Sequence, residues 1–435
     1  MDFTELAIAL LLILFLLLGS GVWVALSLVG VAIVCIAVFT GRPIGSSMYS
    51  TLWTSSTSWT LTALPLFIWM GEILYRTRLS ESLFRGLSPW LGWLPGRLMH
   101  TNIIGCTLFA AVSGSSAATL TTVGKMSMPE LSKRGYSDFM SVGTLAGAST
   151  LGLMIPPSLT MIVYGVITNQ SIPKLFIAGI IPGLVLAVMF MSYVVAWGIL
   201  KKPKIEEEQP MTMKQRLHES RLLIPVALLI ITVIGSMYSG LATATEAAAL
   251  GVVGALLLAV IQRSLTFTAL MESLMGAAKT SCMIALILAG ASFLTLAMGF
   301  TGLPRGLAEW VGGLDLSPFM LLIALMFVYI VLGCFLDGIS AVVLTMAVVT
   351  PMLNEAGIDL LWFGIFVLVM VEMAQITPPV GFNLFVMKGL THYSLGFIAK
   401  AAAPMFLIMV LMAMLLIAFP DLATFLPSYM NEATM

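Results

Sequence analysis

The chain has 435 residues, of which 60% are hydrophobic and only 9% charged, and its formal net charge is zero. This composition and a mean hydropathy of +1.07 lie outside the range of soluble domains, and the lack of net positive charge argues against a nucleic-acid partner. The sequence therefore predicts an all-α polytopic protein whose surroundings are a lipid bilayer. The four cysteines are scattered one per apolar segment, which favours small packing residues over disulfides or metal ligands.

Apolar runs long enough to cross a bilayer recur along the chain. The first, residues 5–40, is either one long tilted helix or two helices interrupted at Gly19–Gly21. Five later runs predict single spanning helices: 172–200, 221–238, 244–262, 279–300 and 400–419. Two shorter segments, 79–96 and 303–313, contain tryptophan and have polar flanks, which predicts amphipathic arm helices lying along the membrane.

Two further apolar segments are interrupted midway by small polar residues. Residues 101–134 contain Ser113-Gly-Ser-Ser116, and residues 318–354 contain Gly333 and then Asp337-Gly-Ile-Ser340. Non-helical backbone survives at membrane depth only when protein or a water-filled cavity surrounds it. We therefore predict two re-entrant helical hairpins whose tips are these polar clusters.

A double proline follows each hairpin, Pro156-Pro157 after the first and Pro378-Pro379 after the second, so the pattern repeats with an offset of 222 residues (378 minus 156). Each pair removes two amide donors and frees carbonyls one turn upstream, and nearby glycines permit unwinding. Freed carbonyls and neighbouring hydroxyls are hard oxygen ligands suited to Na⁺. The alternative is a plain proline kink; two double prolines at matched positions favour two broken helices.

Basic residues set the expected orientation. The segment 201–221 carries six lysines and arginines, which predicts a cytoplasmic loop. Counting crossings from this loop, the first hairpin enters from the cytoplasm and the second from outside, which is typical of inverted-repeat transporters. We divide the chain into N-terminal scaffold helices with an arm (1–98), a first transport repeat (99–200), the loop (201–221), further scaffold helices with an arm (222–278), and a second transport repeat with a C-terminal helix (279–435).

Asp337 is the strongest single candidate for a functional residue. A carboxylate in an apolar segment costs about 2.5–3.5 kcal/mol to insert, so it normally faces a partner or a pathway. At a hairpin tip it also lies beside a helix N-terminus, whose dipole stabilises an anion, so it can cap the helix, bind a cation or do both. Glu72, Glu246 and Glu372 are weaker candidates because they lie away from the polar tips.

Several runs resemble the large membrane subunit of tripartite ATP-independent periplasmic (TRAP) transporters, and together they cover nearly the whole chain. They are Ser113-Gly-Ser-Ser-Ala-Ala-Thr, Met128-Pro-Glu-Leu, Ile155-Pro-Pro-Ser, Leu175-Phe-Ile-Ala-Gly-Ile-Ile-Pro-Gly, Thr243-Ala-Thr-Glu and Ile376-Thr-Pro-Pro-Val-Gly-Phe-Asn. The resemblance implies an inverted-repeat, elevator-type transporter in the bacterial inner membrane. It also implies uptake of a small organic anion, a carboxylate or sulfonate, driven by Na⁺. The implied partners are a periplasmic substrate-binding protein and a small four-helix membrane subunit.

The resemblance also implies site residues, carried over by position. A first Na⁺ would be held by Ser113, Ser115, Ser116, Gly147, Gly152 and Pro156, and a second by Asp337, Gly338, Ser340, Gln375, Thr377 and Pro378. The substrate would lie between the tips, near Ser116, Ser158, Ser340 and Asn383. No arginine lies in either tip, so the sequence does not identify the anion.

Three other functions are alternative interpretations of these features. A stand-alone ion-coupled anion symporter would transport without a binding protein, and a channel would conduct without substrate. An intramembrane serine hydrolase would need a base near the serines of the first tip, whereas the histidines fall in loops or at membrane edges. No phosphate-binding loop of the GxxxxGK[ST] type occurs, so we expect neither ATP hydrolysis nor another enzymatic activity from this chain.

Overall fold

The computed structural model describes residues 3–77, 86–87, 89–201, 212–313, 317–334, 336–379 and 381–430, and this part of the chain is helical, with no strand. Much of the predicted arm 79–96 and residues 202–211 of the predicted loop lie outside the described residues. Within the described part, six helices are long and apolar enough to cross a membrane. The predicted all-α polytopic fold is confirmed.

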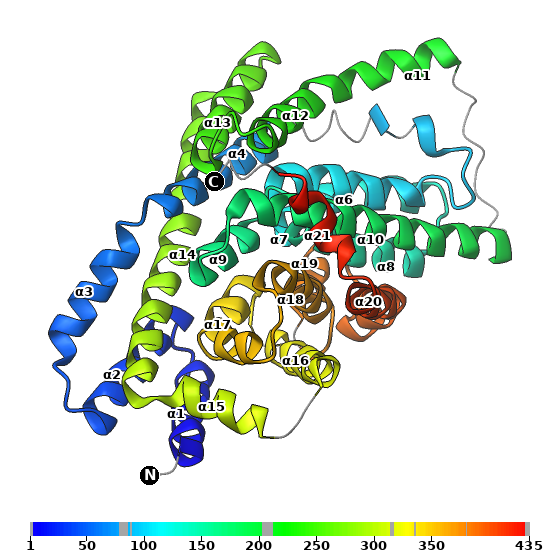
Figure 1. Cartoon of the computed structure of the whole chain (residues 1–435). Coiled ribbons are helices and arrows are strands. Elements are labelled where there is room, and N and C mark those ends of the chain that lie inside the picture. Colours follow the sequence, from blue (N-terminus) through cyan, green and yellow to red (C-terminus); the bar gives the residue numbers. More distant parts are fainter. Residues whose placement is uncertain are drawn as a thin grey trace.

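The N-terminal apolar run forms two helices, α1 (Phe3–Gly19) and α2 (Val24–Phe39), so the break at the glycines is real. Next come α3 (Ile44–Ser56), which was not predicted, the 3-10 turn η1 (Trp59–Thr62) and α4 (Ala63–Arg76). After the first repeat come α11 (Met213–Ser220), η3 (Arg221–Leu223), α12 (Ile224–Tyr238), α13 (Ala244–Ile261) and α14 (Phe267–Thr301). Helices α2, α3, α13 and α14 lie along one side of the molecule (Figure 1).

The first repeat is a hairpin followed by a broken helix. Its elements are α6 (Met99–Ser113), α7 (Ser116–Lys133), α8 (Asp138–Ala148), the 3-10 turn η2 (Ser149–Leu153), α9 (Leu159–Thr168) and α10 (Ile172–Lys201). The hairpin bounds agree closely with the predicted 101–134, and the helix break falls at the double proline.

The second repeat has the same order. After α15 (Leu303–Gly312), which forms a helix at the second predicted arm, come α16 (Pro318–Gly333), α17 (Gly338–Glu355), α18 (Leu360–Gln375), α19 (Phe382–Leu390), α20 (Leu395–Ala418) and α21 (Asp421–Ser428). Adding 222 to the bounds of α7, 116 and 133, gives 338 and 355, the bounds of α17. Both double prolines have a cis peptide bond between their two residues. The duplication read from the sequence is therefore a duplication of structure.

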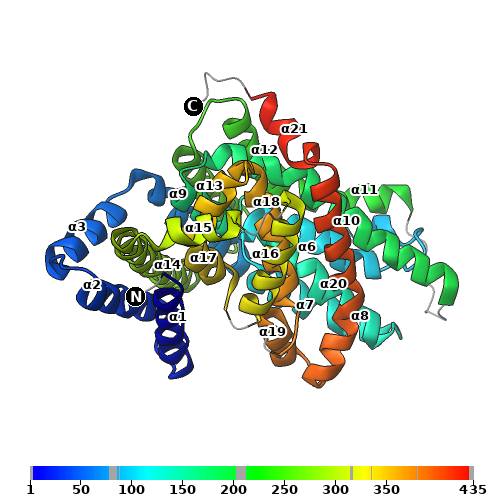
Figure 2. The ribbon, with the colours of Figure 1, turned by 60° about the horizontal axis from the view of Figure 1, so that its bottom comes forward.

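The two repeats interlock on the side of the molecule away from α2 and α3, with α9 and α17 next to α14 (Figures 1 and 2). Turn η2 packs against α6 and α7 of its own repeat and against α18 of the other, and α9 packs against α17. The Tyr164 hydroxyl donates to the Leu360 carbonyl oxygen at 2.6 Å, which ties α9 to the first turn of α18. A methyl group on Gly364 would lie 2.7 Å from that tyrosine ring, so the helices approach closely here.

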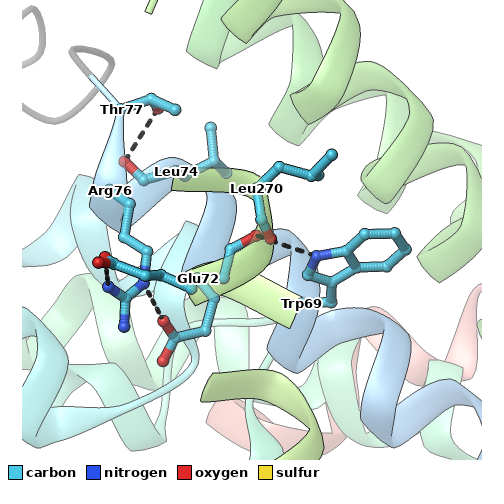
Figure 3. A network of polar contacts seen from close by, with 8 residues as sticks. Trp69, Glu72, Leu74, Arg76, Thr77 and Leu270 are labelled. Atoms are coloured by element: carbon cyan, nitrogen blue, oxygen red, sulfur yellow. Dashed lines mark hydrogen bonds and ion pairs between the residues drawn. The ribbon is translucent and has the colours of Figure 1, made fainter. Parts of the chain in front are cut away.

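The junction of α4 with α14 is polar on one side (Figure 3). The Arg76 guanidinium binds the Glu72 carboxylate at 2.9 Å and the Glu272 carboxylate at 2.7 Å, and the Trp69 indole donates to the Ser273 hydroxyl at 3.2 Å. Helix α14 runs without interruption across the predicted boundary between residues 278 and 279. The division into scaffold and transport parts remains a prediction at this helix.

Candidate functional site

The first tip is a sharp turn between two hairpin helices. Gly114 ends α6 with a φ of 59°, and a side chain there would lie 2.7 Å from the Pro157 carbonyl oxygen. Glycine therefore suits both the left-handed turn and the close approach to the double proline. Ser115 caps α7 by accepting from the Ala118 amide at 3.5 Å, and the hydroxyls of Ser113 and Thr119 lie 2.9 Å apart.

The first tip lies directly on the unwound part of the broken helix. A methyl group on Gly152 would lie 2.8 Å from the Ser115 carbonyl carbon and 2.9 Å from the Ser116 amide nitrogen. The Leu159 amide, just beyond the double proline, donates to the Gly114 carbonyl at 3.4 Å. Among the residues predicted for the first ion, the structure thus brings Ser115 and Ser116 close to Gly152, while Gly114 of the same tip lies against Pro157.

Gly147 packs against a different neighbour. Its carbonyl oxygen accepts a 2.8 Å hydrogen bond from the Thr150 hydroxyl, and a methyl group on it would lie 2.5 Å from the Met405 side chain of α20. These contacts involve α20 and η2 rather than the tip serines, so the assignment of Gly147 to the ion site remains a prediction.

Asn383, in the first turn of α19, connects the second repeat to the first tip. Its side-chain nitrogen donates to the Ser116 hydroxyl at 2.5 Å and to the Ser149 hydroxyl at 3.2 Å. Its side-chain oxygen is buried and finds no hydrogen-bond partner among the described residues. Ser149 was not predicted from the sequence; its place between Gly147 and Gly152 is the signal that could have indicated it.

The second tip is capped by a carboxylate. Asp337 accepts from the amides of Ile339 at 3.2 Å and Ser340 at 3.4 Å, and the Ser340 hydroxyl donates to the same side chain. The N-cap role considered for Asp337 is confirmed, and its half-buried carboxylate remains at the tip. A methyl group on Gly338 would lie 3.1 Å from the Gln375 amide nitrogen and 3.5 Å from the Leu153 side chain.

The residues of the second break lie around the end of α18. The side-chain oxygen of Gln375 is buried without a partner among the described residues, whereas the Thr377 hydroxyl donates to the Met373 carbonyl at 2.6 Å. The Pro378 carbonyl accepts from the Cys334 thiol at 3.2 Å. Gln375 therefore has its side-chain nitrogen beside Gly338 and a buried side-chain oxygen without a partner among the described residues.

A hydrogen bond joins two of the four predicted substrate residues, and the placing of the substrate remains a prediction. Ser116 and Asn383 are in direct contact. Ser158 is fully buried as the N-cap of α9, accepting from the Met161 amide at 3.4 Å, and Ser340 is bonded within its own tip. The polar centre that the structure assembles is therefore built on Ser116, Ser149 and Asn383.

Two of the weaker carboxylate candidates have structural roles. Glu72 is paired with Arg76 at the junction of α4 and α14. Glu246 forms a capping box at the start of α13, where its carboxylate accepts from the Thr243 amide at 2.8 Å. Glu372 is different, because it is fully buried in α18 and forms no salt bridge with a described residue.

A comparison with protein families identifies the family to which this arrangement of hairpins and broken helices belongs. The family described as tripartite ATP-independent periplasmic transporter, DctM component, matches residues 10–422. The chain belongs to this family. The TRAP resemblance stated from the sequence is thereby confirmed, and the family match extends over both tips and both breaks.

Individual relatives support the same membership. The C4-dicarboxylate TRAP transporter large permease protein DctM of Pseudomonas aeruginosa is 32% identical over 381 residues, covering 87% of this chain and 89% of that protein. The ectoine TRAP transporter large permease protein TeaC of Halomonas elongata is 33% identical over 368 residues, covering 84% and 86%. These TRAP relatives are named as permeases, so this chain is a membrane transporter subunit.

A solved structure shares the fold. The YdaH transporter of Alcanivorax borkumensis superposes with a TM-score of 0.60 over 94% of this chain and 96% of that one. The sequence identity is 13%, so the likeness concerns the arrangement of helices alone.

Proposed function

We propose that this TRAP subunit takes up a small organic anion by Na⁺-coupled, elevator-type transport, after a periplasmic substrate-binding protein delivers the anion. One observation carries the proposal: each repeat presents a helix N-terminus at a polar hairpin tip, lodged against an interrupted helix. Helix N-termini favour anions, and carbonyls freed by an interruption favour hard cations. If the anion and the cation bind at the same place, the binding of one can raise the affinity for the other, which is the coupling that the proposal requires.

The oxygen atoms at the two tips fit Na⁺. Hydroxyl, carbonyl and carboxylate oxygens are hard ligands, and the buried side-chain oxygen of Gln375, near the end of α18, has no partner among the described residues. We assign a first ion to Ser113, Ser115, Ser116, Gly147, Gly152 and Pro156, and a second to Asp337, Gly338, Ser340, Gln375, Thr377 and Pro378. When bound, the ions would supply positive charge that offsets the charge of the anion.

The substrate would bind near Ser116 and Asn383, beside the N-terminus of α7. The unpartnered Asn383 oxygen and the Ser149 hydroxyl add polar groups there that can discriminate between substrates. Ser158, the N-cap of α9, and Ser340, in the second tip, complete the proposed set. The two relatives are named for C4-dicarboxylate and ectoine, so neither name transfers to this chain.

The outer faces of the scaffold helices support partners within a membrane. Large apolar side chains are exposed on α12, α13 and α14, among them Ile231, Leu257 and Met283. We propose that lipid of the bacterial inner membrane and a small four-helix membrane subunit cover these faces. The repeats on the opposite side would then be free to move against a fixed scaffold.

The test is uptake by proteoliposomes that contain the chain with its small subunit. Radiolabelled dicarboxylates, sugar acids and sulfonates are offered with an inward Na⁺ gradient, with and without the binding protein. Accumulation that needs both the gradient and the binding protein is the expected result. Accumulation without the binding protein would indicate a stand-alone symporter, and accumulation without the gradient would overturn Na⁺ coupling.

A further inference from the structure

Glu372 differs from the other candidate carboxylates within apolar segments, because no ion pair or helix cap among the described residues accounts for it. Glu72 has its arginine and Glu246 has its helix cap. Glu372 has a relative exposure of 0%, lies in the last turns of α18, and has one carboxyl oxygen without any partner among the described residues. A carboxylate withdrawn from water in this way is costly unless something neutralises it.

Its other oxygen faces Thr150 across the two repeats. The distance from the Thr150 hydroxyl oxygen to the Glu372 carboxyl oxygen is 3.5 Å, and the two residues are 222 positions apart. This separation equals the repeat offset, so the same position in each repeat meets its counterpart. Glu372 therefore lies where η2 of the first repeat packs against α18 of the second.

The hydrogen bonds of Thr150 indicate which group carries the proton. A threonine hydroxyl has one proton to donate. The Gly147 carbonyl lies 2.8 Å from that hydroxyl, and a carbonyl can only accept, so the proton points there. The longer contact with Glu372 is then favourable when a protonated carboxyl group donates to the threonine oxygen.

The helices packed against α18 bring no counter-charge to Glu372 from their described residues. The tyrosines of these helices and the aspartate that caps α17 form hydrogen bonds with residues other than Glu372. Tyr164 bonds to the Leu360 carbonyl, Tyr329 to Thr345 and Asp337 to Ser340. The Cys334 thiol is bonded to the carbonyls of Ile330 and Pro378. The remaining ionisable groups on these elements are exposed or half-buried: Lys174, Tyr193, Lys201, Glu355, Lys388, Lys400 and Asp421.

We propose that Glu372 is a proton-binding site at the crossing of the two broken helices. The carboxylate takes its proton from water and, as a neutral acid, holds α18 against the turn that positions Ser149 beside Asn383. Loss of the proton to water would leave a buried anion facing Thr150, and the threonine hydroxyl would turn from Gly147 towards it. Proton occupancy would in this way be linked to the geometry of the polar centre, whether or not Na⁺ drives transport.

The direct test is infrared spectroscopy of the purified full-length chain, prepared with isotope-labelled glutamate. At neutral pH we expect the carbonyl band of a protonated glutamic acid, absent from Glu372→Gln and present in Glu355→Gln, a control at an exposed glutamate. Absence of this band from the wild-type protein would overturn the proposal without depending on how any variant folds.

Thermal unfolding gives an independent readout. We expect the apparent melting temperature of the wild-type chain to fall as pH rises from about 6 to about 9. In this pH range the folded chain keeps the proton on Glu372, whereas the unfolded chain has released it. Glu372→Gln keeps a neutral donor and should lack this part of the pH dependence, whereas Glu355→Gln should retain it. The proposal would be overturned if the infrared spectrum showed Glu372 as a carboxylate and the melting temperature rose with Na⁺ concentration but did not change with pH. Glu372 would then belong to a sodium site.

Discussion

The two hairpin tips occupy matched positions in the repeats but differ in chemistry and packing. Ser115 caps α7 in the first tip, which lies against Gly152 and against a buried double proline. Asp337 caps α17 in the second tip, and Pro378 and Pro379 beyond it are exposed. Duplication has therefore preserved the helix boundaries while the capping residues diverged. The first tip offers neutral oxygens in tight packing, and the second offers a charge in a more open setting.

Removing the charge of the second tip should have the largest effect. Asn caps helices about as well as Asp, so Asp337→Asn removes the charge and leaves α17 capped. We expect Na⁺-driven uptake to fall about 10- to 100-fold, because a charged interaction of about 1.5–3 kcal/mol is lost. The measurement is the initial rate of uptake against Na⁺ concentration in proteoliposomes with the partner proteins.

A matched control exists in the same repeat. Asp359 caps α18 by accepting from the Leu361 amide at 2.7 Å, and it is exposed and away from the tip. Asp359→Asn should leave the rate and its Na⁺ dependence unchanged. If Asp337→Asn behaved like Asp359→Asn, the carboxylate at the tip would be a cap and nothing more.

Adding one methyl group should separate the tips by their packing. At Gly152 the methyl would meet the backbone of Ser115 and Ser116 at 2.8–2.9 Å, whereas at Gly338 it would meet side chains of Val371 and Gln375 at 2.6 and 3.1 Å. Side chains can move aside and backbone cannot. We expect Gly152→Ala to lose about 1–3 kcal/mol of stability and Gly338→Ala to lose less, measured by thermal unfolding of the purified chain.

The control for this comparison is a glycine at which an added methyl group would contact no other atom. A methyl group added to Gly389, within α19, would have no described atom within 4 Å, so Gly389→Ala should not destabilise the protein. Equal losses at Gly152 and Gly338 would contradict the difference in packing between the two tips.

Much of the fold could be predicted because prolines, glycines and polar clusters interrupt long apolar runs. The hairpins, both helix breaks and the five later spans follow from those interruptions. Helix α3 was missed because it is rich in serine and threonine and buries none of its residues. Helix α14 begins at Phe267, well before the predicted 279, with Thr266 as its N-cap; its first turns also carry Glu272, paired with Arg76, and Ser273, bonded to Trp69.

The site could be predicted only in part. The tips were located because Ser113–Ser116 and Asp337–Ser340 stand out within apolar sequence. Ser149 does not stand out, and Glu372 was only a weaker candidate, since the contacts that distinguish both residues cross between the two repeats. A side chain's partner in another repeat depends on how the helices cross, and no local pattern encodes that crossing.

Substituting Asn383 tests whether the two repeats contribute different residues to the polar centre, as they do to the two tips. Its counterpart in the first repeat is Met161 (383 minus 222), an apolar residue that cannot replace its hydrogen bonds. Asn383→Ala leaves the buried Ser116 and Ser149 hydroxyls without their amide donor, at a cost of about 1–2 kcal/mol. We expect KM for the transported anion to rise several-fold, with Met161→Leu as the control that conserves volume. An unchanged KM in Asn383→Ala would place the substrate elsewhere.

Ser115→Ala should have the smallest effect, although it removes the residue that aligns with Asp337. The substitution deletes the cap of α7, which costs about 0.5–2 kcal/mol, while the carbonyl oxygens that would hold an ion at this tip remain. We expect a lower melting temperature with Na⁺-dependent uptake largely retained, and Ser115→Thr should preserve both because threonine also caps helices. If Ser115→Ala instead abolished Na⁺ dependence as Asp337→Asn is expected to do, a hydroxyl and a carboxylate would be equivalent ligands. The difference between the tips would then lie in packing alone.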